Sequence, residues 1–193
     1  MVESERVDAT TPEAILDVFR LPYRWAAESF QTEGRTLDVG GGEDRIGHAL
    51  LGADDIDTDP GLDNTFTGSV LDLPFADRSY ALVLCFETIE HVAKPLQALS
   101  ELLRVTGSRL IVGSVNSDGP NFVRSGQRWE PIWKGSSNAF HLSEMGQVAF
   151  AQLFSGLDVS FYSSVETMFP DGLAIVRGLE RHAVANYAMV RVR

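Results

Sequence analysis

A run of glycines follows a short apolar stretch in the segment Leu37–Gly42, which reads LDVGGG. Glycine turns of this kind let the backbone approach a ligand closely, and a helix that begins after the turn offers its first amides to that ligand. Ligands of open α/β sheets bind at the carboxyl ends of strands. We therefore expect Asp38, Gly40, Gly41 and Gly42 to line a site for a nucleotide-like ligand, although a glycine turn can also simply close a loop.

Two acidic residues follow at points where strands and loops are expected to meet. Asp57, with Thr58 after it, ends a second predicted strand, and its carboxylate suits both hydroxyls of a ribose. Asp72 can accept a hydrogen bond from an adenine amino group while the amide of Leu73 donates to the ring. Both acids also have a simpler interpretation, because aspartate often forms turns and caps loops.

The segment Glu87–His91, which reads ETIEH, follows an apolar run typical of a strand buried on both faces. At the end of that strand, the backbone of Cys85 and Phe86 is expected to face the bound ligand. His91 is a candidate general base, because the ordinary pKa of histidine lies near neutrality. The alternative is that Glu90 and His91 only start a helix and hold a neighbouring loop.

The elements that position these residues alternate between strand and helix, which argues for a parallel α/β sheet. Residues 116–140 are rich in glycine, serine, asparagine and proline and predict a long loop. A first helix is expected to begin at Pro12 after a Thr11 cap and to kink or split at Pro22. The other predicted elements are strands at 36–39, 80–86, 109–115, 157–165 and 187–192, a strand ending at 57, and helices at 46–51, 95–105 and 143–154.

The composition predicts a cytoplasmic protein with one domain over residues 1–193. Within it, 1–35 is a helical lead-in, 36–115 the ligand-binding half and 116–193 an acceptor-side loop, helix and final strands. The net charge of -11 repels phosphate backbones, so nucleic acid is an unlikely partner. A single cysteine, Cys85, excludes an intrachain disulfide and a cysteine-rich zinc site. No apolar run is long enough to span a membrane, and no secretory signal is expected.

In this order and spacing, the motifs resemble the class I S-adenosylmethionine-dependent methyltransferases, most closely the branch that often modifies small molecules, quinones, sugars and lipids. The resemblance covers Leu37 to Val115 and includes Asp72–Phe75 (DLPF) and Glu90–Val92 (EHV). It implies a Rossmann-like, seven-stranded, mostly parallel sheet with an antiparallel terminal strand and helices on both faces. It also implies S-adenosylmethionine as cofactor, S-adenosylhomocysteine as product and a small-molecule acceptor, with His91 or His141 as the base if the acceptor atom is oxygen.

The chain departs from the family pattern in three places. Asp44 stands where a third glycine is usual, so its charge would oppose the cofactor's carboxylate unless it turns away or caps a helix from Arg45. The short distance between Asp57 and Asp72 predicts that the usual second helix is largely missing. The turn before the fifth strand, 106–108, is also shorter than usual.

Three alternatives remain open at this point. Some metal-dependent O-methyltransferases carry the same E-x-x-E-H pattern with a later histidine, so Glu87, Glu90, His91 and His141 could bind a divalent metal. We do not favour a metal site, because the first glutamate also occurs in metal-free members. A nicotinamide-dependent oxidoreductase would leave Asp72 without a role. A non-catalytic binding or partner domain would account for Asp44 and the shortened helices.

Overall fold

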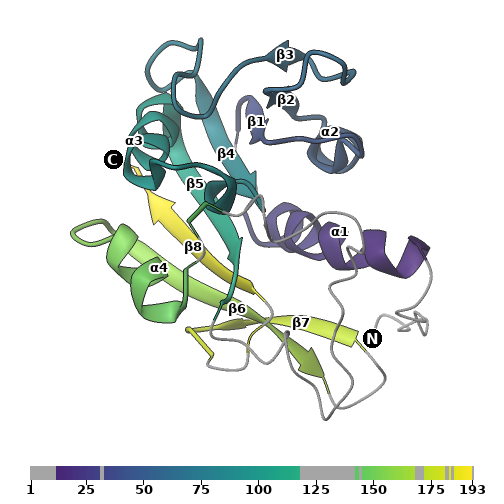
Figure 1. Cartoon of the computed structure of the whole chain (residues 1–193), viewed down its shortest axis with the longest axis vertical. Coiled ribbons are helices and arrows are strands. Elements are labelled where there is room, and N and C mark those ends of the chain that lie inside the picture. Colours follow the sequence, from purple (N-terminus) through teal and green to yellow (C-terminus); the bar gives the residue numbers. More distant parts are fainter. Residues whose placement is uncertain are drawn as a thin grey trace.

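The computed structural model describes residues 12–30, 33–117, 142–143, 145–167, 172–180, 183 and 185–192. Its strands form one sheet in the order β3-β2-β1-β4-β5-β8-β6-β7, with β3 and β7 at the two edges (Figure 1). The pairs from β3 to β5 are parallel. The strands are β1 (Thr36–Val39), β2 (Asp54–Asp57), β3 (Phe66–Thr67), β4 (Tyr80–Phe86), β5 (Thr106–Val115), β6 (Val159–Thr167), β7 (Gly172–Arg177) and β8 (Ala185–Arg191).

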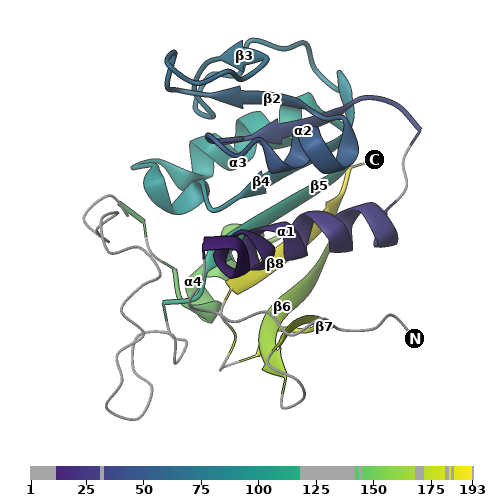
Figure 2. The same ribbon diagram turned by 90° about the vertical axis from the view of Figure 1, so that its right-hand side faces the viewer.

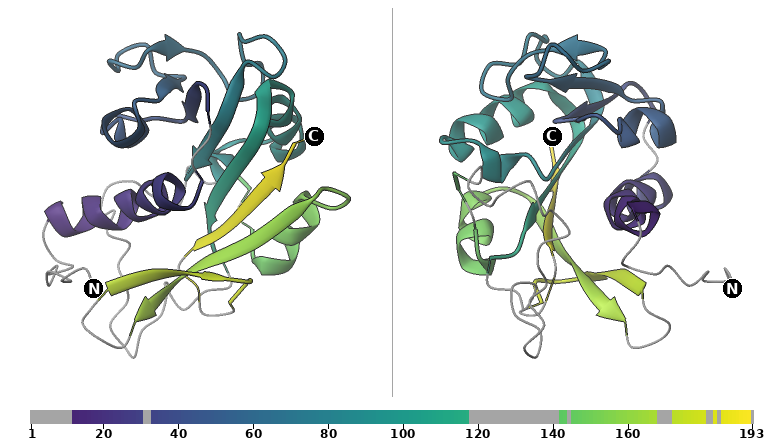
Figure 3. Two further views of the ribbon diagram at one scale, coloured as in Figure 1. Left: turned by 180° about the vertical axis from the view of Figure 1, so that it is seen from behind. Right: turned by 45° about the vertical axis from the view of Figure 1, so that its right-hand side comes forward.

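Helices cover both faces of this sheet, as expected. Figures 2 and 3 show α1 (Pro12–Ser29) and α2 (Ile46–Leu51) on one face, and α3 (Pro95–Val105) and α4 (Gln147–Leu153) on the other. The central strands β4 and β5 are therefore buried on both sides, which explains their nearly continuous apolar sequence. The buried residues of α3 recur every three or four positions, so one face of this helix packs on the sheet: Ala98, Leu99, Leu102 and Val105.

The sheet has eight strands rather than the expected seven, and two of them run against the others. β8 lies inside the sheet, antiparallel to both β5 and β6, while β7 forms the edge antiparallel to β6. The prediction of one antiparallel terminal strand missed β7. Strand β6 is long enough to pair with β8 through its first part and with β7 through its second part. That partner became visible only in the folded sheet, because the 172–177 sequence is a short apolar run without a clear period.

The connections differ in detail from the sequence-based expectations. The chain passes from β2 to β3 through residues 58–65 without a helix, which confirms the trimmed second helix. β5 begins at Thr106, directly after α3 ends, so the predicted turn is part of a strand. α1 continues through Pro22 as a single helix instead of splitting there. None of the described helices is long and apolar enough to cross a membrane.

Candidate cofactor site

The glycine turn lies against the end of β2. The amide of Gly40 donates to the Ile56 carbonyl at 2.8 Å, and the amide of Gly42 donates to Oδ2 of Asp57 at 3.2 Å. The second carboxylate oxygen, Oδ1, accepts the amide of Asp59 at 3.1 Å. Asp57 thus ends β2 partly buried and held by two backbone amides, with Thr58 exposed beside it. Because each carboxylate oxygen can accept more than one hydrogen bond, Asp57 retains acceptor capacity for ribose hydroxyls.

Gly40 lies at the point where the strand order reverses, between β1 and β4. This residue has a φ of 83°, and a Cβ added to it would collide with the side chain of Thr88. The Thr88 hydroxyl lies 2.9 Å from the Phe86 carbonyl and 3.2 Å from the Val39 carbonyl, at the ends of the two strands. Glycine is therefore required here both by the backbone conformation and by the neighbour. Such reversals of strand order are where open α/β sheets bind their ligands.

Asp38, expected among the ligand-binding residues, is fully buried beneath the turn. The Tyr23 hydroxyl of α1 donates to its Oδ1 at 3.1 Å, and the close approach of Gly47 leaves no room for a Cβ on that residue. Burial raises the pKa of Asp38 to about 7, although the Tyr23 hydroxyl and the Gly47 amide oppose this rise. Asp38 therefore supports the turn from below. Neither Tyr23 nor Gly47 belongs to a motif that the sequence alone could connect with Asp38.

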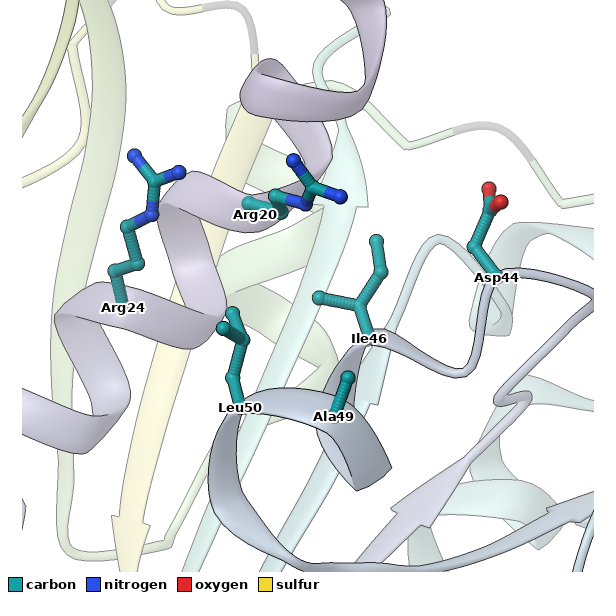
Figure 4. A pocket seen from close by; sticks show the side chains of 6 residues that line it. All are labelled: Arg20, Arg24, Asp44, Ile46, Ala49 and Leu50. Atoms are coloured by element: carbon teal, nitrogen blue, oxygen red, sulfur yellow. The ribbon is translucent and has the colours of Figure 1, made fainter. Parts of the chain in front are cut away.

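Asp44, the departure from the family pattern, does not cap a helix. The helix α2 begins after Arg45, which has a left-handed backbone (φ 46°, ψ 45°) and no side-chain cap bond. Asp44 instead lines a hollow between α1 and α2 together with Arg20 and, on the opposite side from Asp44, Arg24 (Figure 4). The arginines share this space with an apolar floor that includes Ile46. The carboxylate of Asp44, which was expected to oppose the cofactor's carboxylate, therefore lines a hollow that also contains two arginines.

The loop expected to hold adenine is attached to α3. Asp72 has an exposed side chain, which leaves its carboxylate accessible. The Leu73 amide, expected to donate to the adenine ring, donates instead to Oε2 of Glu101 at 2.9 Å. The Leu73 carbonyl accepts from Nη2 of Arg104 at 2.8 Å, and Gln97 donates to the Leu71 carbonyl at 2.9 Å. Glu101 and Arg104 act in the site only through this loop, and their helical spacing gave no sign of it.

The end of β4 places a pair of carboxyl groups next to the glycine turn. Cys85 and Phe86 are buried within the strand, and burial raises the pKa of the Cys85 thiol. Glu87 follows with a left-handed φ of 50°. Burial and the adjacent Glu90 carboxyl hold the pKa of Glu87 well above its usual range. Glu90 is itself fully buried, and its Oε1 accepts the Val115 amide at 3.3 Å.

His91 ends the 3-10 turn η1 (Ile89–His91) with an exposed side chain. The Glu90 carbonyl accepts the amides of Leu142 and Ser143 at 2.8 and 2.9 Å, so the distal segment is bound to η1. His141, the other candidate base and metal ligand, lies outside the described residues. Within the described parts of the chain, no three histidine, cysteine, aspartate or glutamate side chains are grouped to hold a metal ion.

Three comparisons place this geometry among known proteins. Residues 37–111 match the family of methyltransferase domains, while a search of curated proteins finds no match. A Thermotoga maritima protein described as a SAM-dependent methyltransferase, possible histamine N-methyltransferase, has a TM-score of 0.69 at 17% identity and covers 94% of both chains.

Two further structures have the same fold. A SAM-dependent methyltransferase from Archaeoglobus fulgidus gives a TM-score of 0.61 at 14% identity, over 91% of this chain and 93% of its own. The small RNA methyltransferase HEN1 gives 0.66 at 17% identity, over 99% of this chain and 27% of its own. At such identities the structures establish a shared fold alone. The family match covers residues 37–111, which carry most of the sequence motifs, and the chain has the fold of S-adenosylmethionine-dependent methyltransferases.

Proposed function

We propose that S-adenosylmethionine lies across the carboxyl ends of β2, β1 and β4, and that its methyl group passes to an oxygen of a small-molecule acceptor. One observation carries the placement of the cofactor: the hydrogen bond from the Gly42 amide to Asp57 joins the first two motifs at one edge of the sheet. In this arrangement Gly40 and Gly42 contact the methionine tail, Asp57 the ribose, and Asp72 the adenine. The cofactor supplies the reactive sulfonium, and the protein orients it for in-line attack.

The Leu73 amide is absent from this proposed set, because Glu101 already accepts its hydrogen. The buried Leu73 side chain and the exposed Asp72 carboxylate still place apolar and acceptor groups on the same loop. Adenine is recognised in this proposal by Asp72 and by apolar contact. The backbone at Cys85 and Phe86 borders the amino group of the methionine tail.

The acceptor side is proposed to lie beyond η1, where the exposed His91 follows β4 directly. A histidine there can remove the proton of an acceptor hydroxyl as the methyl group is transferred. A net charge of -11 disfavours a polyanionic acceptor, so a small molecule is preferred over nucleic acid. The acidic composition and single cysteine are consistent with a cytoplasmic enzyme.

Calorimetry with S-adenosylmethionine and S-adenosylhomocysteine tests the cofactor site. Both are expected to bind with one-to-one stoichiometry, and Asp57→Asn is expected to weaken binding about tenfold, the loss of a charge-assisted hydrogen-bond pair. A folded sample that binds neither compound would refute the proposal.

Release of S-adenosylhomocysteine, measured with a panel of phenols, catechols, carboxylates and amines, tests the acceptor. His91→Asn is expected to lower kcat for a hydroxyl acceptor by about 10²-fold or more while cofactor affinity stays unchanged. His48→Asn is the matched control, because His48 lies on α2, outside the proposed site, with its Nδ1 2.9 Å from the Ala53 carbonyl. Turnover of amines alone would move the reaction from oxygen to nitrogen, and cofactor binding without any turnover would favour the non-catalytic alternative.

A further inference from the structure

A partly buried ion pair lies directly beneath the glycine turn. Nε of Arg45 lies 2.7 Å from Oδ2 of Asp55, and Nη2 lies 3.3 Å from Oδ1. The Asp55 side chain is fully buried, and its Oδ1 also accepts the amide and the hydroxyl of Thr65 at 2.6 Å each. Burial alone would raise the pKa of Asp55, but Arg45 and Thr65 outweigh it and hold the pKa below its usual range. Asp55 is therefore an ionised carboxylate whose hydrogen-bond capacity is filled by four donors.

The same pair joins the turn to the segment that replaces the missing helix. Nη1 of Arg45 reaches Asp63 at 3.3 Å, and Nδ2 of Asn64 donates to the Gly42 carbonyl at 3.4 Å. Residues 58–65 connect β2 to β3 without a helix of their own. The segment is consequently held by Asp55 at Thr65, by Arg45 at Asp63 and by the glycine turn at Asn64. Of these contacts, those with Asp55 involve a carboxylate that is itself fully buried, and charged hydrogen bonds shielded from solvent fix geometry more strictly than exposed ones.

Arg45 has an unusual backbone for this task. It lies in the left-handed region, which a non-glycine residue adopts only when its surroundings impose it. The bidentate bond to Asp55 supplies that constraint, and it directs the side chain of Arg45 under the turn, whereas the preceding residue Asp44 lines the hollow beside α1 (Figure 4). In a chain without the usual third glycine, Arg45 thus fixes the path from Gly42 into α2.

We propose that Arg45 and Asp55 are positioning residues for the cofactor, and that they act by holding the Gly42 amide against the Asp57 carboxylate. The two sites that they connect are the methionine tail at the turn and the ribose at the end of β2. Asp55 and Asp57 lie two positions apart on β2, so their side chains share one face of the sheet. Neither Arg45 nor Asp55 touches the cofactor in this arrangement. The inference rests on the proposed placement of the cofactor at Gly42 and Asp57.

Affinity for S-adenosylhomocysteine, measured by calorimetry on the full chain, tests this role. Arg45→Gln is expected to weaken binding about tenfold, and Arg45→Lys, which keeps the charge but loses the bidentate geometry, about threefold. Arg35→Gln is the matched control. Arg35 directly precedes β1, at the end of that strand away from the glycine turn, and forms an ion pair of 2.6 Å with Asp54, the residue before Asp55. This control is expected to leave the affinity unchanged even if it lowers the melting temperature.

A double-mutant cycle separates positioning from general support of the fold. If Arg45 acts through Asp57, adding Arg45→Gln to Asp57→Asn should weaken the affinity for S-adenosylhomocysteine by less than about threefold further. If the two effects were independent, they would multiply to a total loss of about a hundredfold. Multiplicative losses, or unchanged affinity in Arg45→Gln, would overturn the inference while leaving the cofactor proposal intact. Failure of the unmodified chain to bind S-adenosylhomocysteine would instead remove the cofactor proposal itself. If Arg45→Gln does not fold, the cycle is run with Arg45→Lys, for which the same non-multiplicative result is expected.

Discussion

The Thr88 hydroxyl occupies the space into which a side chain on Gly40 would project, and it lies within 3.2 Å of the carbonyls that end β1 and β4. The two residues belong to motifs far apart in the sequence. Their contact lies at the carboxyl ends of β1 and β4, where the strand order reverses. It packs the glycine turn against the segment after β4, so the two form one structural unit. The shape of this unit decides which substitutions the site tolerates.

Gly40→Ala is expected to lower the free energy of unfolding by about 2–3 kcal/mol, because it combines a positive φ with a collision. Gly52→Ala is a matched control, since Gly52 also has a positive φ, of 62°, but has open space around its Cβ position. The control should cost only about 1 kcal/mol, from backbone strain. Urea unfolding measures both, and adding Thr88→Ala to Gly40→Ala should recover the part due to the collision. Equal losses in the two glycine variants would show that Thr88 imposes no constraint.

The stability of the protein is expected to fall as the pH rises from about 4 to about 7, through the titration of Asp38. The native carboxyl, with a pKa of about 7, keeps its proton in this range, whereas the unfolded one has lost it. The native state therefore binds more protons than the unfolded state, so the free energy of unfolding decreases as the pH rises. Urea unfolding at pH 5 and pH 8 measures the change. Asp38→Asn should reduce it, and the remaining part is expected to come from Glu87, whose pKa is also raised, so Glu87→Gln is measured beside it. A pH dependence that is unchanged in Asp38→Asn would contradict the prediction.

Tyr23→Phe tests the hydroxyl that opposes this rise in pKa. Because the hydroxyl stabilises the ionised form of Asp38, its loss should cost more above pH 7 than at pH 5, by about 1–2 kcal/mol. The phenyl ring keeps the edge-on contact with Phe86; in the native protein the ring centroids of Tyr23 and Phe86 are 4.8 Å apart. The comparison uses urea unfolding at both pH values. An equal loss at the two would mean that the bond does not depend on the charge of Asp38.

Glu101→Ala is expected to weaken S-adenosylhomocysteine binding about three- to tenfold. The substitution removes the acceptor of the Leu73 amide and one of the acceptors of Arg104. The loop bearing Asp72 then loses its fixed position above α3. Ser100→Ala, an exposed change on the same helix, is the control and should have no effect. If Glu101→Ala instead strengthened binding, the freed Leu73 amide would be donating to the adenine ring, as the sequence first suggested.

Methyl transfer is expected to persist after treatment with EDTA, and Mg²⁺, Mn²⁺ or Zn²⁺ should not raise the melting temperature. Glu90 is fully buried and its Oε1 accepts the Val115 amide, which leaves it poorly placed as a ligand for an open metal site. A metal-dependent rise in melting temperature that disappears in Glu87→Gln or His141→Ala would establish the metal-assisted alternative. The variants Glu87→Gln and His141→Ala without metal serve as the reference for each shift.

Local sequence signals determined the parallel half of the fold and its ligand class. The apolar runs that end at Val39 and Phe86 had to be buried strands, and in a parallel sheet their carboxyl ends meet at one edge. The order of the glycine turn, Asp57 and Asp72 therefore predicts that they share one site. The match of residues 37–111 to a methyltransferase domain agrees with the resemblance that these motifs predicted.

The tertiary structure decided the contacts that join residues distant in sequence. Arg45 could have been an ordinary solvated helix residue, and only the position of β2 makes it the partner of Asp55. Likewise, the Leu73 amide was a free donor by sequence, but the packing of α3 places Glu101 against it. β7 pairs with the edge of β6 that β8 leaves open. Periodicity and motifs describe a segment by itself, whereas hydrogen-bond partners and strand pairing depend on which segments the core brings together.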